Sequence, residues 1–469
     1  MSFNSLTFAI LLASVLALYW RLTRRGQNIL LLAASYLFYG WWDWRFLSLL
    51  VYSSLLDYWV ALRIDGAPSQ SVKRRWLAVS LVGNLALLGG FKYCHFFVHS
   101  AAFLIQQLGF HSHEMTLRII LPVGISFYTF QTMSYVIDTY RGHLKPTRDW
   151  PAYLAYVSFF PQLVAGPIER GTTFLPQFLG ERRFDHEAAR DGIKQCLWGL
   201  FKKIAIADYL ALFVDGTYAD PARASGWQLL LATYCFAFVI YGDFSGYSDM
   251  ALGMARLFGF RLMRNFSYPY FSTSLREFWQ RWHISLSTWF RDYVYIPLGG
   301  NRCSTWITRR NVMITCVASG LWHGANWTFV IWGAMHGFAL VVESVLERAW
   351  NRVRLIPDRV KRLLGAWMVF HVVLFGWVFF RAASVGDAWS ILRKIMAIRD
   401  LPHGEWIWLS YLAGMAGLVA VEWSSRHRQH PLEDLRLPAA GRLALYGWLV
   451  AVMVAVSPTT HVPFIYFQF

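Results

Sequence analysis

Long apolar stretches, separated by short polar and basic runs, repeat along almost the whole 469-residue chain. A membrane-crossing helix needs roughly 20 mainly apolar residues, and ten stretches approach that length. They are Phe3–Trp20, Asn28–Trp42, Phe46–Leu62, Trp76–Val98, Ile119–Ile137, Cys196–Val214, Trp227–Phe258, Leu363–Phe380, Glu405–Trp423 and Leu443–Val456. The pattern predicts an all-α polytopic protein with roughly 10–12 transmembrane helices. We expect residues 1–469 to form a single integral-membrane domain.

Basic residues set the expected orientation of these helices. Arg21, Arg24 and Arg25 follow the first apolar stretch, and no positive residue precedes it. A cleavable signal peptide has the reverse order, so we interpret this stretch as a retained span. Basic loops face the cytoplasm of a bacterial inner membrane. The N-terminus is therefore expected outside.

Two apolar segments do not fit this alternation. Trp150–Gly166 has basic loops on both sides, so we expect it to dip into the membrane or to lie in the interface. Asn311–Val342 is bounded in the same way and is too short for two spans of ~30 Å each. We predict a broken or re-entrant helix pair there. Irregular backbone at membrane depth is tolerated where it lines a cavity, which indicates a functional region.

Composition narrows the possible functions. Hydrophobic residues make up 56% of the chain and charged residues 15%, against roughly 25% charged in soluble proteins. The net charge of +17 lies in runs between apolar segments, so we expect contact with membrane lipid and no nucleic acid. Five scattered cysteines without a CxxC pair indicate neither a disulfide framework nor a thiolate metal site. His111, His113 and Glu114 lack a fourth ligand, so no metal site is expected.

The segment LWHGANW, within Asn311–Val342, is the first candidate site. An ionisable residue inside a membrane is a functional candidate, and burial keeps an imidazole neutral, so His323 is available as a base. If the helix continues, Asn326 shares its face and could orient the ring or bind a reacting oxygen. Trp322 is expected beside the substrate passage. The alternative is a packing histidine, the role we expect for His336, which falls on a different helical face.

The second candidate is REFWQRWHISLSTWFRDYVYIPLGGN, residues 276–301. At helical spacing it carries one polar stripe opposite an apolar face. The stripe consists of Arg276, Gln280, His283, Ser287 and Arg291. An interfacial amphipathic helix would give this pattern. The alternative is the cytoplasmic mouth of a tunnel, with arginine facing an anionic donor and His283 deeper inside.

The third candidate is DFSGYSD, which runs from Asp243 to Asp249 within an apolar stretch. These polar residues are not expected to face lipid. They could form a polar wall, a helix break, or a cation or proton site, and no basic residue nearby in sequence decides between them. The chain has no Gly-rich phosphate loop, serine elbow or HExxH motif, which argues against an ATPase or hydrolase.

Together these blocks resemble the membrane-bound O-acyltransferase family. The resemblance also includes LPVGISFYTFQTMSYVIDTYRG, FFPQLVAGPIER and the terminal PFIYFQF, and it covers essentially the whole chain. It is specific to the bacterial branch that acts in alginate O-acetylation and teichoic-acid D-alanylation. Residues of about 119–342 would form the core of such a protein.

The resemblance implies helices around a central funnel, with His323 as the essential histidine and His283 as the second. It implies a cytoplasmic acetyl thioester, acetyl-CoA or another, as donor, with no permanently bound cofactor. Acetyl would reach an exopolysaccharide through an extracytoplasmic partner of esterase (SGNH) fold, beside a polysaccharide synthase complex. Alginate relatives are expected to be longer at the C-terminal end, so a cellulose-like polymer fits equally well. The alternatives are a transporter or flippase without chemistry, peptidoglycan O-acylation, and teichoic-acid D-alanylation.

Overall fold

The computed structural model describes residues 1–469 except 2, 111–119, 353–355, 399–405, 459–461 and 466–469. His111, His113 and Glu114 therefore lie outside the described residues. Every regular element within the described ranges is helical, which confirms the all-α prediction. These residues form two compact units, and the single domain stays a prediction. Unit 1 is Met1–Ile193 with Ala251–Met263, and unit 2 is Lys194–Met250 with Arg264–Phe469.

Seven helical stretches in the described part of the chain are long and apolar enough to cross a membrane. They are Trp44–Asp65, Gln70–Gln107, Gly226–Leu257, Trp327–Glu347, Asp358–Arg381, Ile407–Ser424 and Ala439–Val456. The chain is thus a polytopic membrane protein. Four of the ten expected spans are absent from this set for reasons of length or charge. The helix of the first has only 14 residues and ends at Tyr19, and that of the second has 17. The helix of the fifth begins only at Ile125, and the sixth contains Lys202, Lys203 and Asp208.

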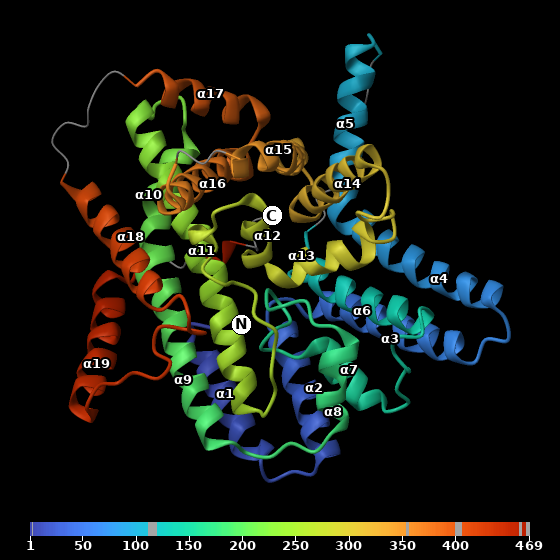
Figure 1. Ribbon diagram of the computed structural model, residues 1–469. Helices are drawn as coiled ribbons and strands as arrows, with labels where there is room; N and C mark the ends of the chain where they lie inside the picture. Colours follow the sequence, from blue (N-terminus) through green and yellow to red (C-terminus); the bar gives the residue numbers. More distant parts are fainter. Residues whose placement is uncertain (2, 111–119, 353–355, 399–405, 459–461, 466–469) are drawn as a thin grey trace. The chain divides into compact units, whose positions relative to one another are not determined.

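Unit 1 packs its helices around a buried polar network and a cluster of phenylalanine rings. Figure 1 shows the course of these helices. The helices of unit 1 are α1 Leu6–Tyr19, α2 Arg24–Gly40, α3 Leu47–Asp65, α4 Gln70–Leu88, α5 Cys94–Gln107, α6 Ile125–Tyr140, α7 Trp150–Ser158 and α8 Gly171–Leu179. Asp57 on α3 accepts hydrogen bonds from Ser80 at 2.6 Å and Asn84 at 2.9 Å on α4. These bonds satisfy a carboxyl group that burial would otherwise penalise.

The segment expected to dip into the membrane or lie in the interface is a short buried helix. In α7 only Trp150 is exposed, while the residues from Pro151 to Ser158 are buried against their neighbours in unit 1. The Phe160 N–H after it donates to the Ser35 hydroxyl on α2 at 3.0 Å. This segment therefore does not lie on the surface of its unit.

Glu169, in the loop after α7, should make stability depend on pH. Its side chain is buried and accepts the Met263 N–H at 2.6 Å. Burial raises its pKa to about 8, against the lowering effects of this bond and of Arg170. Because the folded-state pKa lies above the unfolded value, the stabilisation is full below the unfolded pKa and is lost as pH rises through about 8.

The measurement is thermal unfolding of the purified protein in detergent between pH 6 and pH 9. We expect Glu169→Gln, which stays neutral, to unfold at a higher temperature than wild type at pH 9. Glu187→Gln is the matched control, since Glu187 is largely exposed. Equal pH dependence of wild type and Glu169→Gln would show that this carboxyl group does not cause the effect.

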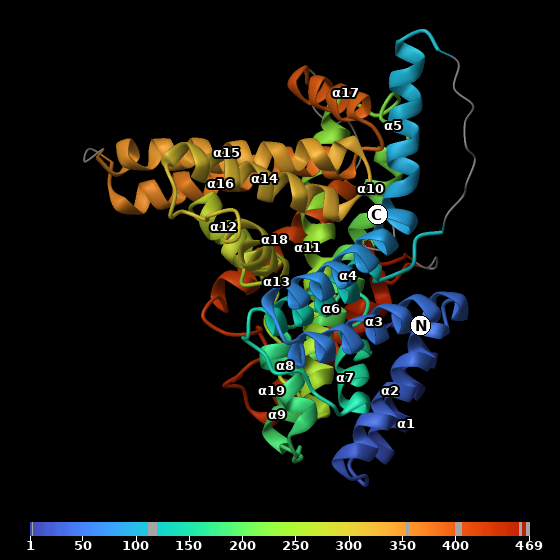
Figure 2. The same ribbon diagram turned by 90° about the vertical axis from the view of Figure 1, so that its right-hand side faces the viewer.

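Unit 2 contains the candidate sites. Its helices are α10 Tyr209–Ala219, α12 Leu275–Arg281, α13 Ile284–Phe290, α14 Thr305–His323, α15 Trp327–Arg352, α16 Asp358–Arg381, α17 Val385–Met396, α18 Ile407–Ser424 and α19 Ala439–Val456. Helices α9 His186–Phe201 and α11 Gly226–Leu257 contribute to both units. Helix α15 packs against both α14 and α16, and the three lie side by side in Figure 2. This three-helix group frames the first candidate site.

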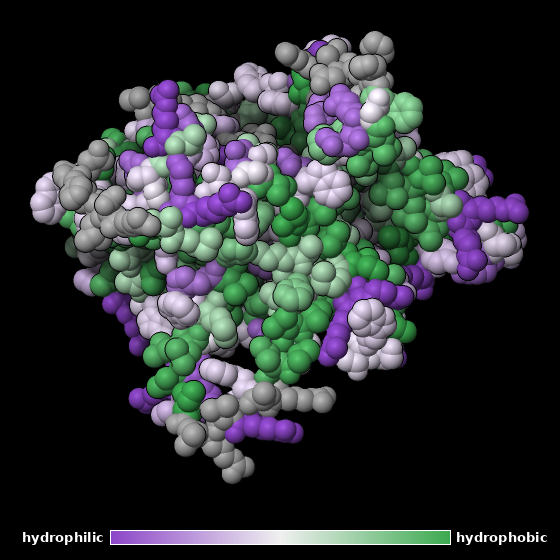
Figure 3. All heavy atoms as spheres, turned by 90° about the horizontal axis from the view of Figure 1, so that it is seen from above, coloured by the Kyte–Doolittle hydropathy of each residue, from purple (hydrophilic) through white to green (hydrophobic). Residues whose placement is uncertain are grey.

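Large hydrophobic side chains remain exposed on many helices. Leu6, Leu443 and Val454 are each more than 70% exposed. Apolar side chains also cover much of the face drawn in Figure 3. Exposed apolar areas of this extent are incompatible with a water-soluble surface but are suited to lipid.

Candidate functional site

The predicted broken helix pair is present as two helices joined at Gly324–Asn326. Helix α14 ends at His323, and Gly324 is extended, with φ −161° and ψ 150°. A Cβ atom at Gly320 would overlap the Phe329 carbonyl oxygen, so the two backbones touch where the pair closes. Asn326 precedes α15, and its Oδ1 accepts the Thr328 N–H at 3.1 Å. The expectation that Asn326 shares a helical face with His323 is therefore wrong, because the helix stops between them.

His323 lies within a shell of aromatic rings and is only 3% exposed. Its ring centroid is 5.0 Å from that of Trp322, 5.1 Å from that of Trp332 and 5.3 Å from that of Phe380. The fourth neighbour is His283, with ring centroids 6.2 Å apart. The two histidines that the sequence singled out separately are thus brought together in unit 2.

His283 occupies a strained turn between α12 and α13. Its backbone is left-handed, with φ 42° and ψ 55°, a conformation that costs a non-glycine residue about 1–2 kcal/mol. Asn265 holds this turn, because its carbonyl oxygen accepts the Ile284 N–H at 2.9 Å. The ring is fully buried beside Phe244, and burial lowers the pKa of His283 to about 3. His283 is therefore a neutral imidazole at physiological pH.

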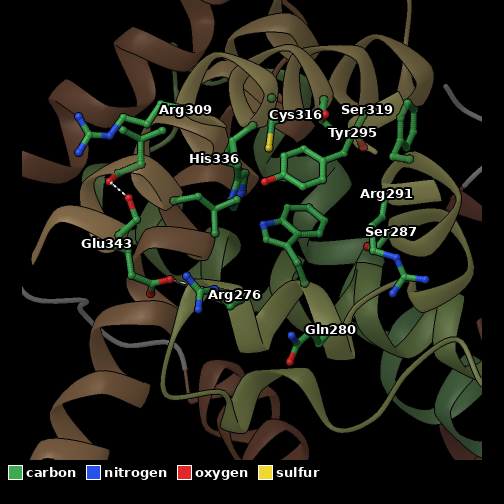
Figure 4. Close-up of a pocket in the computed structure, with 18 of the residues that line it drawn as sticks. Arg276, Gln280, Ser287, Arg291, Tyr295, Arg309, Cys316, Ser319, His336 and Glu343 are labelled. Carbon is green, nitrogen blue, oxygen red and sulfur yellow. Dashed lines mark hydrogen bonds between the residues drawn. The ribbon is translucent and has the colours of Figure 1, made fainter. Parts of the chain in front are cut away.

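A cavity of about 820 Å³ lies between α12–α13, the π-helical segment Arg291–Tyr295, α14 and α15. This volume is typical of sites that enclose a small organic molecule. Figure 4 shows the labelled side chains arranged around it. Arg276, Gln280 and Ser287, which we expected to line a tunnel, are among the lining residues.

The cavity changes character along its length. Arg309 lies near the start of α14, and Glu343 in the second half of α15 accepts the backbone N–H of Arg276 on α12. Ser319 and Trp332 lie toward the helix break. At 1.5 Å per residue, Arg309 and Ser319 are ~15 Å apart along α14. The Arg276 side chain is 63% exposed and Trp332 is 1% exposed, so the charged end is the open mouth and the aromatic end is the floor. Trp332 both lines the floor and contacts the ring of His323.

The structure divides the predicted polar stripe. Arg276, Gln280, Ser287 and Arg291 line the cavity, but His283 is not among the described lining residues. The left-handed turn at His283 interrupts the helix and directs this side chain toward His323 instead. The prediction of one continuous amphipathic helix is therefore wrong. Trp322, His323 and Asn326 are likewise absent from the described cavity lining.

Sequence reasoning missed several cavity residues. His336 was assigned to packing, yet it lines the cavity together with Tyr295, Arg309 and Cys316. The error arose because counting helical faces from His323 assumes an unbroken helix. Within α15, His336 follows Trp332 by four residues, so the two side chains lie on the same face of that helix.

Asp243 and Asp249 belong to an ion-pair network elsewhere in unit 2. Lys203 Nζ lies 2.7 Å from Asp243 Oδ1 and 2.6 Å from Asp208 Oδ1. Lys202 Nζ lies 2.7 Å from Asp249 Oδ2. Helix α11 continues through this region without a break. Neither aspartate is among the described residues that line the 820 Å³ cavity, and their lysine partners favour a structural role.

The glycine in DFSGYSD permits this pairing. A Cβ atom at Gly246 would lie 2.7 Å from the Gly199 carbonyl oxygen, so α9 and α11 approach each other through their backbones. Small residues at helix contacts of this kind let side chains on both sides interact. The network is thus built from two sequence segments about forty residues apart.

Comparison with known proteins identifies the family of this chain. The model of the membrane-bound O-acyltransferase family matches residues 143–385. The matched range contains both histidines, the helix break and the described lining of the cavity.

Curated relatives extend the match beyond this range. A probable alginate O-acetylase of Azotobacter vinelandii is 43% identical over 85% of this chain and 79% of its own. A probable alginate O-acetylase of Pseudomonas putida is 42% identical over the whole of both chains. A peptidoglycan O-acetyltransferase of Helicobacter pylori is 36% identical over 79% of this chain and 74% of its own. The chain belongs to the membrane-bound O-acyltransferase family and is an O-acyltransferase.

Proposed function

We propose that this protein transfers acetyl groups from a thioester donor for the O-acetylation of an exopolysaccharide, alginate or a cellulose-like polymer. The proposal rests on one observation: the Trp332 side chain lines the cavity and also contacts the ring of His323. The names of the alginate relatives support acetyl as the group and a polysaccharide as its destination.

The charge distribution of the cavity supports an anionic donor such as acetyl-CoA or another acetyl thioester. Among the described lining residues, Arg276, Arg291 and Arg309 are basic and only Glu343 is acidic. That carboxylate already accepts the backbone N–H groups of Leu275 at 2.6 Å and Arg276 at 3.1 Å. Guanidinium groups bind phosphate oxygens through several parallel hydrogen bonds. The carrier would occupy the charged mouth, with its thioester toward the aromatic floor.

In the proposed reaction His323 acts as general base. Its neutral imidazole takes the proton of an acceptor hydroxyl while that oxygen attacks the thioester carbonyl carbon. The carbon–sulfur bond then breaks, and the departing thiolate takes the proton back from the imidazolium. A thioester is already activated, so this chemistry requires no bound cofactor. The step requires the Trp332 ring to move, or the thioester to pass along its edge.

His283 and Asn326 would support this step from different positions. The neutral ring of His283, 6.2 Å from that of His323 between centroids, can hydrogen-bond the acceptor or orient the base. Asn326 Nδ2 donates to the Ala383 carbonyl oxygen at 3.1 Å. We therefore assign Asn326 to positioning the helix break, and leave stabilisation of the oxyanion to a backbone N–H group.

The proposed setting is the bacterial inner membrane, with the N-terminus outside and the basic loops in the cytoplasm. Basic residues immediately after the first apolar stretch support this orientation. We propose that an extracytoplasmic acetyltransferase of esterase fold receives the acetyl group and that a polysaccharide synthase complex supplies the acceptor. Acetylated sugars outside the cell need both a donor inside and a route across the membrane.

The decisive experiment incubates the purified protein with radiolabelled acetyl thioester, an oligosaccharide acceptor and an extracytoplasmic protein extract that supplies the proposed esterase-fold partner. We expect release of free thiol together with labelled ester. A transporter without chemistry would leave the thioester bond intact, and that result would refute the proposal. The His323→Ala protein is the negative control.

Peptidoglycan is the second candidate acceptor, supported by the H. pylori relative. The two acceptors are distinguished by supplying exopolysaccharide oligomers and muropeptides in parallel to the same preparation. Preferential labelling of muropeptides would indicate that the acceptor is peptidoglycan and not an exopolysaccharide. Teichoic-acid D-alanylation predicts labelling from a D-alanyl thioester instead.

A further inference from the structure

His336 is a buried, polar side chain on the wall of the cavity. It is 1% exposed, and neither ring nitrogen has a hydrogen-bond partner within the described part of the chain. Its ring centroid lies 4.9 Å from that of Trp332 and 5.1 Å from that of Trp279. A buried polar group left without a partner is costly, so such a group on a cavity wall indicates that a ligand completes its hydrogen bonding.

The surrounding structure fixes this ring against the cavity. A Cβ atom on Gly376 of α16 would lie 2.9 Å from His336 Nε2, so only glycine at that position leaves room for the imidazole. Figure 4 shows His336 among the lining side chains, beside Cys316 and Tyr295. The position is therefore held by packing from three sides.

The depth of His336 can be measured along α15. Trp332, His336, Leu340 and Glu343 all line the cavity at helical spacing. At 1.5 Å per residue, His336 is ~6 Å from the floor at Trp332 and ~10 Å from Glu343 at the mouth. If the thioester of the donor lies at the floor, the part of the thiol carrier that follows the sulfur atom lies beside His336.

The chemical structure of the thiol that carries the acetyl group predicts which part of the donor lies beside His336. In a thioester of the cysteamine-amide type, an amide follows the sulfur after two carbons, ~4–5 Å away for ordinary bond lengths of ~1.5 Å. An amide can both donate and accept a hydrogen bond, and so can a neutral imidazole.

We propose that His336 is a specificity residue that hydrogen-bonds this amide and thereby selects amide-bearing acetyl thioesters. The inference rests on the proposed function and deepens it. His336 acts on binding of the donor, so its loss should raise KM for the donor and leave kcat nearly unchanged. A site built to hydrogen-bond a substrate discriminates against analogues that lack the group.

The experiment compares S-acetyl-N-acetylcysteamine with an S-acetyl alkanethiol of equal length that lacks the amide. Wild type is expected to show about tenfold lower KM for the amide compound, as expected for one hydrogen bond in a buried site. His336→Phe keeps the ring size and should abolish this preference. His336→Gln, which retains donor and acceptor groups, should restore part of it.

His427→Ala, at an exposed loop position, is the matched histidine control and should keep the wild-type preference. Thermal unfolding checks that each variant is folded, and Gly376→Ala, which displaces the His336 ring, supplies a second test if His336→Phe is unstable. An unchanged amide preference in the folded variants overturns the inference. A fall in kcat at constant KM also overturns it. If wild type cleaves no acetyl thioester at all, the proposed function itself has failed.

Discussion

Cells that carry His323→Ala are expected to make unacetylated polymer. Loss of a general base typically lowers a rate by 10²–10⁴-fold, which brings acetylation below the level detected by NMR of the purified polysaccharide. Removal of the imidazole also leaves a void beside Trp332 and Phe380, so the amount of protein in the membrane must be measured alongside.

His427→Ala again serves as the control histidine, because His427 is exposed in a loop and should support normal acetylation. His323→Gln tests whether ring shape or proton transfer matters, since it keeps hydrogen bonding but cannot act as a base at neutral pH. Wild-type acetylation in cells with either His323 variant at normal abundance would remove this residue from the reaction.

Lys203→Met is expected to cause the largest loss of stability. Lys203 is buried between Asp208 and Asp243, so its removal leaves two carboxylates facing each other without a cation. Breaking a buried ion pair from one side typically costs about 3–5 kcal/mol. We expect a strongly lowered unfolding temperature in detergent and reduced amounts in the membrane.

Arg190→Met is the matched control, because its ion pair with Glu187 is exposed and such pairs contribute about 0–1 kcal/mol. Changing Asp243 and Asp208 to asparagine together with Lys203→Met removes both charges and should recover part of the stability. An unfolding temperature of Lys203→Met within a degree or two of wild type would show that this pairing contributes little.

The sequence was sufficient to predict most of the helices. Apolar runs of nearly twenty residues have few alternatives to a helix, and α11, α16, α18 and α19 follow their expected ranges closely. The pair α14–α15 was also predicted as broken, because an apolar segment between two basic runs was too short for two spans.

Helical phase was the main source of error at the site. Sequence spacing predicts which residues share a face only while the helix continues. The left-handed turn at His283 and the extended residue Gly324 each reset that phase. Asn326 was consequently placed on the wrong face, and His336 was overlooked as a cavity residue.

The lysine partners of Asp243 and Asp249 were hidden for a different reason. Lys202 and Lys203 precede them by about forty residues, and only the backbone contact at Gly199 and Gly246 brings the segments together. A single sequence contains no record of which helices touch. The sequence therefore predicted that the DFSGYSD motif is shielded from lipid, but it could not predict which lysines neutralise the two aspartates.

The contact at Gly320 has a mechanical consequence. Since the α14 and α15 backbones meet there without intervening side chains, the two helices cannot slide or spread without losing that contact. The pair therefore forms a stiff support for His323 at the end of α14. A bulkier residue at this crossing would force the helices apart and displace the imidazole without touching it.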